Sequence, residues 1–369
     1  MKMHQWIWQY PDWPQFVYDI ESLLPKLTGL HRLIGALEIT SRTLAGDKLL
    51  DAREKALTDD VLETSAIEGE ILHRSSVRAS IRKRLGLPVD HDDSTRHTDA
   101  LVAMLLDARK YADSPLTEQK LFAWQAALFP TGYSGLHKIR VGKYRGEEHM
   151  QIVSGPIDKE KIHYIAPPRS QIENDSKLLL AYINKKSELD PLIQAGVAHI
   201  WFIMIHPFDD GNGRIARAIT DYILSTKYPH MMQIVSLSKE ISMNKKGYYA
   251  TLEQAGRGGL DITAWLSWFL ATFAKALHES KWTIDRIMKK VHFWQKYKET
   301  PLNDRQHKVL NRLLDAGEKF EGGMTTRKYA GMTKCSKVTA SRDLSDLEAK
   351  NILIKRPGGG RSTSYEIAP

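Results

Sequence analysis

The segment from Pro191 to Ile205 most constrains how this chain can fold, because it is apolar on nearly every face. A helix without a polar stripe lies at the centre of a domain, surrounded by other elements. Asp190 and Pro191 are typical of a helix start, with aspartate as the cap and proline at the first helical position. The longest apolar run, Val197–Ile205, contains His199 and is far too short to span a bilayer. The sequence therefore predicts a domain built around one buried helix.

Elsewhere, helix-like periodicity is frequent and strand-like alternation is scarce, which favours a mainly α fold with a small β component. Two short β-prone runs, Met150–Val153 and Lys161–Ile165, are separated by a Ser-Gly-Pro turn and predict a β-hairpin. Nearer the C-terminal end, we expect helices over 245–256, 261–279 and 280–296.

The chain's 369 residues and its apolar fraction of 42% allow two or three folded domains. A net charge of +9 permits an anionic partner, such as ATP, nucleic acid or an acidic protein surface, without selecting one. The single cysteine, Cys335, cannot form an internal disulfide, and we find no signal pattern or membrane-spanning run, so a cytoplasmic protein is expected. The breaks in the pattern predict a helical N-terminal domain, a central domain and a compact C-terminal domain, with bounds 1–96, 97–298 and 302–369.

The candidate chemistry is concentrated in the loop His206-Pro-Phe-Asp-Asp-Gly-Asn-Gly-Arg214, which follows the buried helix. Pro207 forces the chain out of helical geometry, so His206 is presented at a helix end, where an imidazole can act as a general base. Gly211 and Gly213 allow a ligand to approach the backbone closely. Their N–H groups lead into the next helix, whose N-terminus attracts anions.

Three charged side chains complete this segment. Arg214 and Arg217 are three residues apart and project from one side of the first helical turn, where arginine can bind pairs of phosphate oxygens. Asp210 is a carboxylate within reach of a metal ion, and Mg²⁺ normally accompanies a triphosphate. The whole set suits attack by a hydroxyl on a phosphate. A tight helical connection around a core histidine would explain His206 alone, but not the full set.

Residues 206–217 match, at every defined position, the motif His-Pro-Phe-x-Asp/Glu-Gly-Asn-Gly-Arg-x-x-Arg, and the chain therefore resembles the Fic (filamentation induced by cAMP) family. The resemblance covers about 100–280 and implies a helical Fic core in which the hairpin at 148–165 is the substrate-binding flap. Most Fic enzymes transfer AMP from ATP to a Ser, Thr or Tyr hydroxyl of a protein. The resemblance thus implies a protein adenylyltransferase that uses ATP and Mg²⁺.

By position, the resemblance also implies a role for each residue of the loop. His206 deprotonates the target hydroxyl, which attacks the α-phosphorus in line, and Asp210 holds Mg²⁺ on the α- and β-phosphates. Asn212 and Gly213 contribute to the anion hole. Arg214 holds the β- and γ-phosphates. In such a reaction the protein acts by positioning and by stabilising charge.

Two further features match the layout of this family. Tyr248 and Tyr249 lie where Fic proteins place residues that line the adenine pocket, although such a pair is equally well explained as half-buried core. The hairpin can align a target segment by adding it as an edge strand. Family members with this arrangement often self-associate, so a homodimer is one expectation. The sequence does not identify the target protein.

An inhibitory motif is predicted upstream, at Thr64-Ser-Ala-Ile-Glu-Gly69, which resembles the Fic pattern Ser/Thr-x-x-x-Glu-Gly/Asn. Thr64 and Glu68 share one helix face, and Gly69 can end that helix and leave Glu68 at its tip. The resemblance implies that Glu68 pairs with Arg217, which otherwise holds the γ-phosphate, and so misaligns ATP. A solvated surface glutamate is the ordinary alternative.

Residues 302–369 predict a winged-helix-like domain, from a helix–turn–helix pattern over 325–350 and a hairpin around Pro357-Gly-Gly-Gly360. The segment has 13 Lys and Arg against eight Asp and Glu, a net charge of +5. Its expected exposed basic side chains are Lys334, Lys337, Arg342 and, on the wing, Arg361. DNA and a protein or dimer partner fit this modest charge equally well.

Two other functions remain as alternatives. In some relatives the inhibitory glutamate helps water remove AMP from the target, so the chain could be a de-AMPylase. A winged-helix regulator that uses the loop only to sense a nucleotide would need the cradle and the arginines, but not His206. The intact His206 therefore favours an enzyme.

Overall fold

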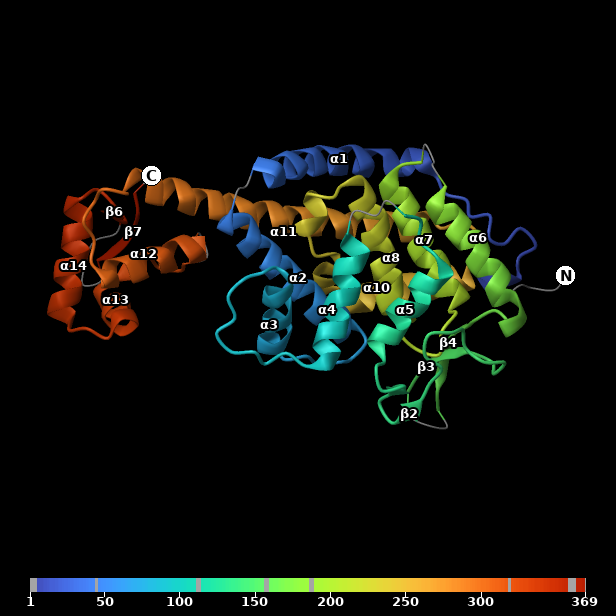
Figure 1. Ribbon diagram of the computed structural model, residues 1–369. Helices are drawn as coiled ribbons and strands as arrows, with labels where there is room; N and C mark the ends of the chain where they lie inside the picture. Colours follow the sequence, from blue (N-terminus) through green and yellow to red (C-terminus); the bar gives the residue numbers. More distant parts are fainter. Residues whose placement is uncertain are drawn as a thin grey trace. The chain divides into compact units, whose positions relative to one another are not determined.

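The computed structural model describes residues 5–43, 46–110, 114–155, 159–185, 189–317, 320–357 and 363–368. Over these residues the chain is mainly helical with small antiparallel sheets, so the predicted fold class is confirmed (Figure 1). It divides into two compact units, Met1–Ser280 and Lys281–Pro369. The predicted boundary between 96 and 97 falls inside the first unit, and the predicted start at 302 lies inside the second.

The first unit consists of helices and two short β-hairpins. Its helices are α1 Ile20–Thr43, α2 Asp47–Ile67, α3 Arg74–Arg84, α4 Arg96–Arg109, α5 Glu118–Leu128, α6 Ile172–Asn184, α7 Pro191–Ile205, α8 Asn212–Lys227, α9 Leu237–Met243, α10 Lys245–Arg257 and the first part of α11 Thr263–Lys296. Its strands are β1 Tyr133–Ser134, β2 His137–Lys138, β3 Gln151–Ser154 and β4 Lys161–Ile165. β1 pairs with β2 and β3 with β4, both antiparallel, so the predicted hairpin is present.

Helix α7 is the buried centre of this unit, as its sequence predicts, since every α7 residue after the first is buried. Asp190 caps it by accepting the N–H of Leu192 at 2.8 Å. Gly196 lets α11 approach closely, because a Cβ at that position would lie 2.7 Å from Leu266. The indole of Trp265 also donates to the Gly196 carbonyl at 2.8 Å. These contacts hold α7 rigidly up to its end, where the motif loop, residues 206–214, begins.

The prediction of separate helices at 261–279 and 280–296 is wrong, because these residues form one continuous helix, α11. No glycine or proline lies between Thr263 and Lys296 to end it. The polar residue at the expected break, Ser280, is accommodated inside the helix, where its hydroxyl donates to the carbonyl of Ala276 at 2.9 Å.

A buried ionic cluster fixes α2 against the helix that follows the motif loop. Arg109 on α4 donates to Asp60 on α2 at 2.6 Å and to Asp221 on α8 at 2.9 Å. The second oxygen of Asp60 accepts from the Ser236 hydroxyl at 2.7 Å. The three charged side chains are at most 5% exposed, so loss of one would leave an uncompensated buried charge and cost about 3–5 kcal/mol. The cluster therefore positions the end of α2 relative to α8.

The second unit has its own core around a three-stranded sheet. Its elements after α11 are α12 Asp304–Ala316, β5 Met324–Thr325, α13 Thr326–Thr333, α14 Lys337–Ala349, β6 Leu353–Lys355 and β7 Ser364–Ile367. The strand order is β5-β7-β6, with both pairs antiparallel. Val309, Tyr329, Leu344 and Ile352 are among the fully buried core residues. The tip of the β6–β7 hairpin, with Arg361, lies outside the described residues, and the winged-helix assignment stays a prediction.

Candidate functional site

His206 is presented at the end of α7 in an unusual backbone conformation. It is the C-cap residue and lies in the left-handed region, with φ 50° and ψ 58°. For a residue other than glycine this conformation costs about 1–2 kcal/mol, so the surrounding structure must hold it. Arg145 does so, because its Nε donates to the His206 carbonyl and its backbone N–H donates to the Pro207 carbonyl, both at 2.9 Å. Sequence reasoning missed Arg145, whose one local signal is its place between Gly142 and Gly146.

The imidazole of His206 is set up as a neutral base. Its Nδ1 lies 3.2 Å from the carbonyl oxygen of Ile203, which can only accept, so Nδ1 carries the proton and Nε2 has a free lone pair. The pKa of His206 is lowered to about 4, mainly by burial and also by the nearby Arg145 cation, while the hydrogen bond to Ile203 and the charges of Glu68 and Asp210 oppose the shift. The ring is therefore unprotonated at neutral pH, as proton abstraction requires.

The middle of the motif loop is closed by a buried aromatic and an amide. Phe208 is fully buried. Asn212 accepts the N–H of Phe208 at 3.0 Å and donates to its carbonyl at 2.8 Å. The Asn212 side chain thus holds the loop, and its backbone N–H is the group left to bind an anion. Gly211 precedes α8 with φ 89°, and a Cβ there would lie 2.8 Å from Leu128, so only glycine fits.

The N-terminus of α8 forms an anion cradle that a carboxylate occupies. A Cβ at Gly213 would lie 2.2 Å from Oε1 of Glu68 and 3.3 Å from Nη1 of Arg217. Two buried nitrogens beside it, Nε of Arg214 and Nη1 of Arg217, have no hydrogen-bond partner among the described residues. Buried polar atoms are normally satisfied. A ligand with several oxygens on one centre, such as a phosphate, would supply the missing acceptors at a helix N-terminus.

Glu68 and Thr64 both bind Arg217, as the shared helix face predicts. Nη2 of Arg217 donates to Glu68 Oε1 at 2.7 Å and to the Thr64 carbonyl at 3.0 Å. Its Nε donates to the Thr64 hydroxyl at 2.7 Å. Helix α2 ends at Ile67, and Gly69 follows with φ 87°. The Arg217 side chain is 4% exposed and that of Glu68 27%, so this ion pair is partly shielded from water.

A second carboxylate from the same segment binds the other arginine of the motif. Arg214 Nη1 donates to Oε2 of Glu70 at 2.9 Å, and His97 Nε2 lies 2.5 Å from the second oxygen, Oε1. The hydrogen bond from His97 lowers the pKa of Glu70, and the Arg214 charge adds to this effect. Sequence reasoning missed Glu70 and His97, although the repeat Glu-Gly-Glu at 68–70 was visible. One segment therefore neutralises both arginines.

The two aspartates of the motif loop have different surroundings. Asp209 accepts the backbone N–H of Arg140 at 2.7 Å and is part of the loop scaffold. Asp210 accepts the N–H of Gly211 at 2.5 Å and a hydrogen bond from the Ser134 hydroxyl. No group of three His, Cys, Asp or Glu suited to a metal occurs within the described part of the chain. Mg²⁺ commonly takes only one or two protein carboxylates together with water and substrate phosphates, so Asp210 alone would be enough, and Mg²⁺ at this site stays a prediction.

The predicted tyrosine pair divides into a core residue and a partly exposed one. Tyr248 is 1% exposed, and its hydroxyl lies 2.8 Å from Nε2 of His199. Burial lowers the pKa of His199 to about 3, so this inner histidine is neutral and structural. Tyr249 is 41% exposed and donates to the carbonyl of Ile67 at 3.1 Å. Of the two, Tyr249 is the one that a nucleotide could contact, and adenine binding by the pair stays a prediction.

Comparison with known proteins identifies the domain that carries this site. Residues 115–224 match the Fic/DOC family, and residues 6–87 match a domain of unknown function (DUF4172). The chain carries a Fic domain. The site residues of the motif loop, and Arg217, all lie within the matched range, whereas Glu68 and Glu70 lie in the preceding domain.

Relatives of the Fic domain occur among characterised proteins. Protein adenylyltransferase fic-1 of Caenorhabditis elegans is 25% identical over 203 residues, which cover 54% of this chain and 37% of that protein. Protein adenylyltransferase Fic of Nematostella vectensis is 24% identical over 219 residues, which cover 57% and 45%. The chain thus spans less than half the length of these relatives.

The fold is shared with solved Fic structures. A Fic family protein from Desulfovibrio desulfuricans G20 matches with a TM-score of 0.52 at 20% identity, over 93% of this chain and 96% of that one. A Fic domain containing signaling protein from Bacteroides thetaiotaomicron VPI-5482 matches with a TM-score of 0.53 at 20% identity, over 72% and 96%. At this identity the likeness shows the fold alone.

The β3–β4 hairpin of the Fic domain is anchored by aromatics from the N-terminal segment. Trp6 is buried and packs edge-on against Tyr164, with ring centroids 5.5 Å apart. The Trp8 indole donates to the carbonyl of Ile165 at 2.7 Å.

Across the described ranges, no helix is both long enough and apolar enough to cross a membrane.

Proposed function

We propose that this chain is an autoinhibited protein adenylyltransferase, which moves AMP from ATP to a Ser, Thr or Tyr hydroxyl of a protein, itself included. The observation that carries the proposal is the neutral imidazole of His206 beside a helix N-terminus with two buried, unpartnered arginine nitrogens. A base next to a phosphate cradle suits transfer to a hydroxyl. The names of the relatives, protein adenylyltransferases, support AMP as the group transferred.

In this reaction, Nε2 of His206 takes the proton of the target hydroxyl as its oxygen attacks the α-phosphorus. The bond from the α-phosphorus to the bridging oxygen breaks, and pyrophosphate leaves with the electron pair. The N–H groups that begin α8, with Arg214 and Arg217, bind the phosphate oxygens and stabilise the charge that develops. Mg²⁺ held by Asp210 would supply further positive charge on the phosphates.

The brake is competition between carboxylates and phosphates for the same cations. Glu68 lies directly on the α8 N-terminus at Gly213 and binds Arg217, while Glu70 binds Arg214. For productive ATP binding, both carboxylates would have to leave the arginines. If they stayed, the γ-phosphate would be displaced. Because reaction needs in-line geometry, a small displacement of the α-phosphorus costs much of the rate.

The β3–β4 hairpin is the proposed contact for the target. Val153 on β3 is 46% exposed and Ile162 on β4 is 37% exposed, so the hairpin presents apolar side chains to a partner. An extended target segment would add to its edge through main-chain hydrogen bonds, which would align a hydroxyl without reading much sequence.

The test uses purified protein, Mg²⁺ and ATP labelled at the α- or the γ-phosphate, with wild type, Glu68→Gly and His206→Ala side by side. We expect label on protein from α-labelled ATP only, a rise in Glu68→Gly, and loss in His206→Ala. Label from γ-labelled ATP alone would instead mean a kinase. If no variant incorporates label although nucleotide binds, the chain is a de-AMPylase or a sensor, and removal of AMP from a modified protein then separates these two.

A further inference from the structure

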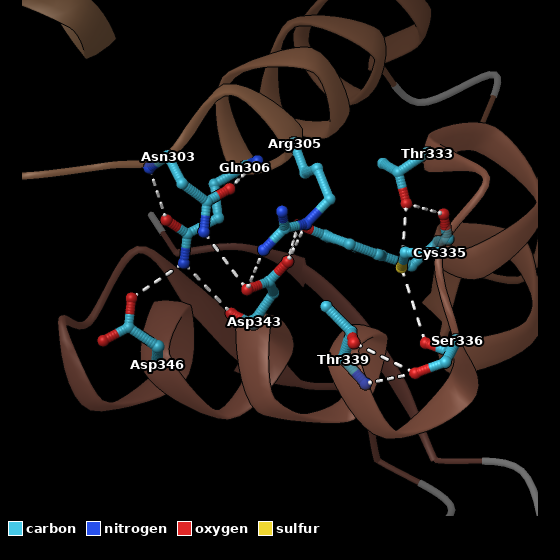
Figure 2. A network of polar contacts seen from close by, with 10 residues as sticks. Asn303, Arg305, Gln306, Thr333, Cys335, Ser336, Thr339, Asp343 and Asp346 are labelled. Atoms are coloured by element: carbon cyan, nitrogen blue, oxygen red, sulfur yellow. Dashed lines mark hydrogen bonds and ion pairs between the residues drawn. The ribbon is translucent and has the colours of Figure 1, made fainter.

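The C-terminal unit contains a helix–turn–helix with a short connection. Helix α13 ends at Thr333, and Lys334 takes the left-handed conformation, with φ 51°, that turns the chain. Ser336 caps α14 by accepting the N–H of Thr339 at 3.1 Å. Figure 2 shows Ser336 and Thr339 at the start of α14, with Asp343 further along the helix and facing Asn303 and Arg305. The geometry places α14 as the second helix of the pair, which in such motifs enters the major groove of DNA.

Helix α14 has one face in the core and one face in solvent. Its inner residues, Ala340, Leu344 and Leu347, are at most 1% exposed. The exposed positions of α14 follow the helical repeat and form one stripe along its outer side; they are Lys337, Val338, Ser341, Arg342, Ser345 and Ala349. This stripe offers methyl groups, hydroxyls and a guanidinium. Those groups bind the thymine methyl, base-edge acceptors and guanine, respectively. The two carboxylates that border the stripe, Asp346 and Glu348, are paired with Lys350 and Lys355.

Charge in this unit is distributed unevenly. The carboxylates of α14 and β7 are each paired with a cation, in the ion pairs Asp343–Arg305, Asp346–Lys350, Glu348–Lys355 and Glu366–Arg356. In contrast, four cations of the helix–turn–helix have no ion-pair partner within the described residues; they are Arg327, Lys334, Lys337 and Arg342. The negative charges of α14 and β7 are thus paired, and the four unpaired cations give the helix–turn–helix a positive surface.

The Asp343 network explains how this arrangement is held. Asp343 is buried and accepts from Arg305 at 2.8 Å, from the Tyr329 hydroxyl at 2.9 Å and from Asn303 at 3.1 Å (Figure 2). These donors come from α12, its cap and α13, so one carboxylate links the three helices. The link lies on the inner side of α14, and the side chains of the outer stripe have no ion-pair partner to displace among the residues that the structure describes.

We propose that this unit binds double-stranded DNA, with the outer stripe of α14 in the major groove and the flanking cations on the phosphates. Arg342 lies on the stripe and reads base edges, whereas Arg327, Lys334 and Lys337 bind the backbone. An acidic protein would also be attracted to the cations. It would be less complementary than DNA to a stripe whose hydroxyl and methyl groups match base edges. The proposal does not depend on AMP transfer.

The experiment measures binding of the full chain to a fluorescent mixed-sequence 20-base-pair duplex by anisotropy, between 50 and 200 mM KCl. We expect binding at 50 mM that weakens steeply with salt. The double variant Lys337→Ala/Arg342→Ala should bind at least tenfold more weakly, with a slope of log affinity against log salt about one unit shallower, because only Lys337 of the pair contacts a phosphate. The matched control, Lys298→Ala, removes an exposed cation of the same unit and should change affinity by less than twofold.

Two readouts make the outcome decisive. Thermal unfolding of each variant should match wild type, since neither substituted side chain is buried or ion-paired among the residues described. Selection from a random duplex library should enrich a motif that Arg342→Ala no longer enriches. Absence of duplex binding at 50 mM KCl, or equal losses in the double variant and in Lys298→Ala, would overturn the proposal and leave a protein partner as the reason for the surface. AMP transfer should be unchanged in the double variant.

Discussion

Two regions of this protein place cations at or near a helix start where phosphates would bind. The burial and the ion pairing of these cations differ between the two regions. At α8, Arg214 and Arg217 are at most 6% exposed on their side chains and are bound by Glu70 and Glu68 of the same chain. On α13 and α14 the cations are exposed and have no such partner within the described ranges. A phosphate must therefore displace a carboxylate at the first region, but only water and salt ions at the second.

Under the two proposals made above, one chain would keep two anion sites under separate control. The α8 site is limited by the position of residues 68–70, which the buried Arg109 cluster holds against α8. The α14 surface is limited by ionic strength, because exposed charges are screened and buried pairs much less so.

The largest effect is expected from removal of the Glu68 carboxylate. Glu68→Gly should raise self-modification on the order of 100-fold, because correct placement of the α-phosphorus is worth about that factor. The measurement is initial incorporation from α-labelled ATP at fixed protein concentration. Glu63→Gln, on the same helix, serves as the control and should behave as wild type. Equal incorporation in Glu68→Gly and wild type would show that α8 is not restrained by this pair.

Salt concentration should affect the two regions very differently, and this is the next largest effect. Raising KCl from 50 to 200 mM should weaken duplex binding by roughly 40-fold if Arg327, Lys334 and Lys337 each contact a phosphate. The activity ratio of Glu68→Gly to wild type should change by less than twofold over the same range, since Arg217 is buried. A ratio that falls as steeply as DNA affinity would mean that the brake behaves as a surface ion pair.

A smaller effect is expected at the second carboxylate. Glu70→Gln should raise incorporation about fivefold, since a partly exposed, charge-assisted contact is worth about 1 kcal/mol. Its effect should appear mainly as a lower KM for ATP, because Arg214 then binds the phosphates without a competitor. An unchanged KM would indicate that Glu70 orients Arg214 for ATP rather than competing with it. His97→Ala should act in the same direction, because His97 lies 2.5 Å from the other oxygen of Glu70.

The smallest effect is expected from pH. The pKa of His206 is lowered to about 4, mainly by burial. A general base must be unprotonated to act. The transferase activity should therefore be present above pH 4 and be lost only as the pH falls through that value. Removing Glu68 takes away a charge that raises this pKa. In Glu68→Gly, kcat/KM for ATP should therefore change less than twofold between pH 8 and about pH 5.5. An acidic limb centred near 6.5 would contradict the buried geometry of His206.

Sequence reasoning succeeded where short-range rules apply. The cap of α7 at Asp190, its end before Pro207 and the common face of Thr64 and Glu68 all follow from residue type and helical spacing. It failed at α11, where helical periodicity alone could not show that one helix continues through Ser280. It also missed Arg145, because a hydrogen bond to the carbonyl of His206, 61 residues away, leaves no local pattern.

The sequence by itself determined the mainly α fold, the buried helix before the motif loop, and the residue types that a phosphate-transfer site needs. Only the tertiary structure decided which cations are free. Glu70 meets Arg214 across 144 residues of chain, whereas the arginines and lysines of α13 and α14 meet no carboxylate within the described part of the chain. Charge composition is a property of the chain, but neutralisation depends on distances of a few ångströms, and those exist only after folding.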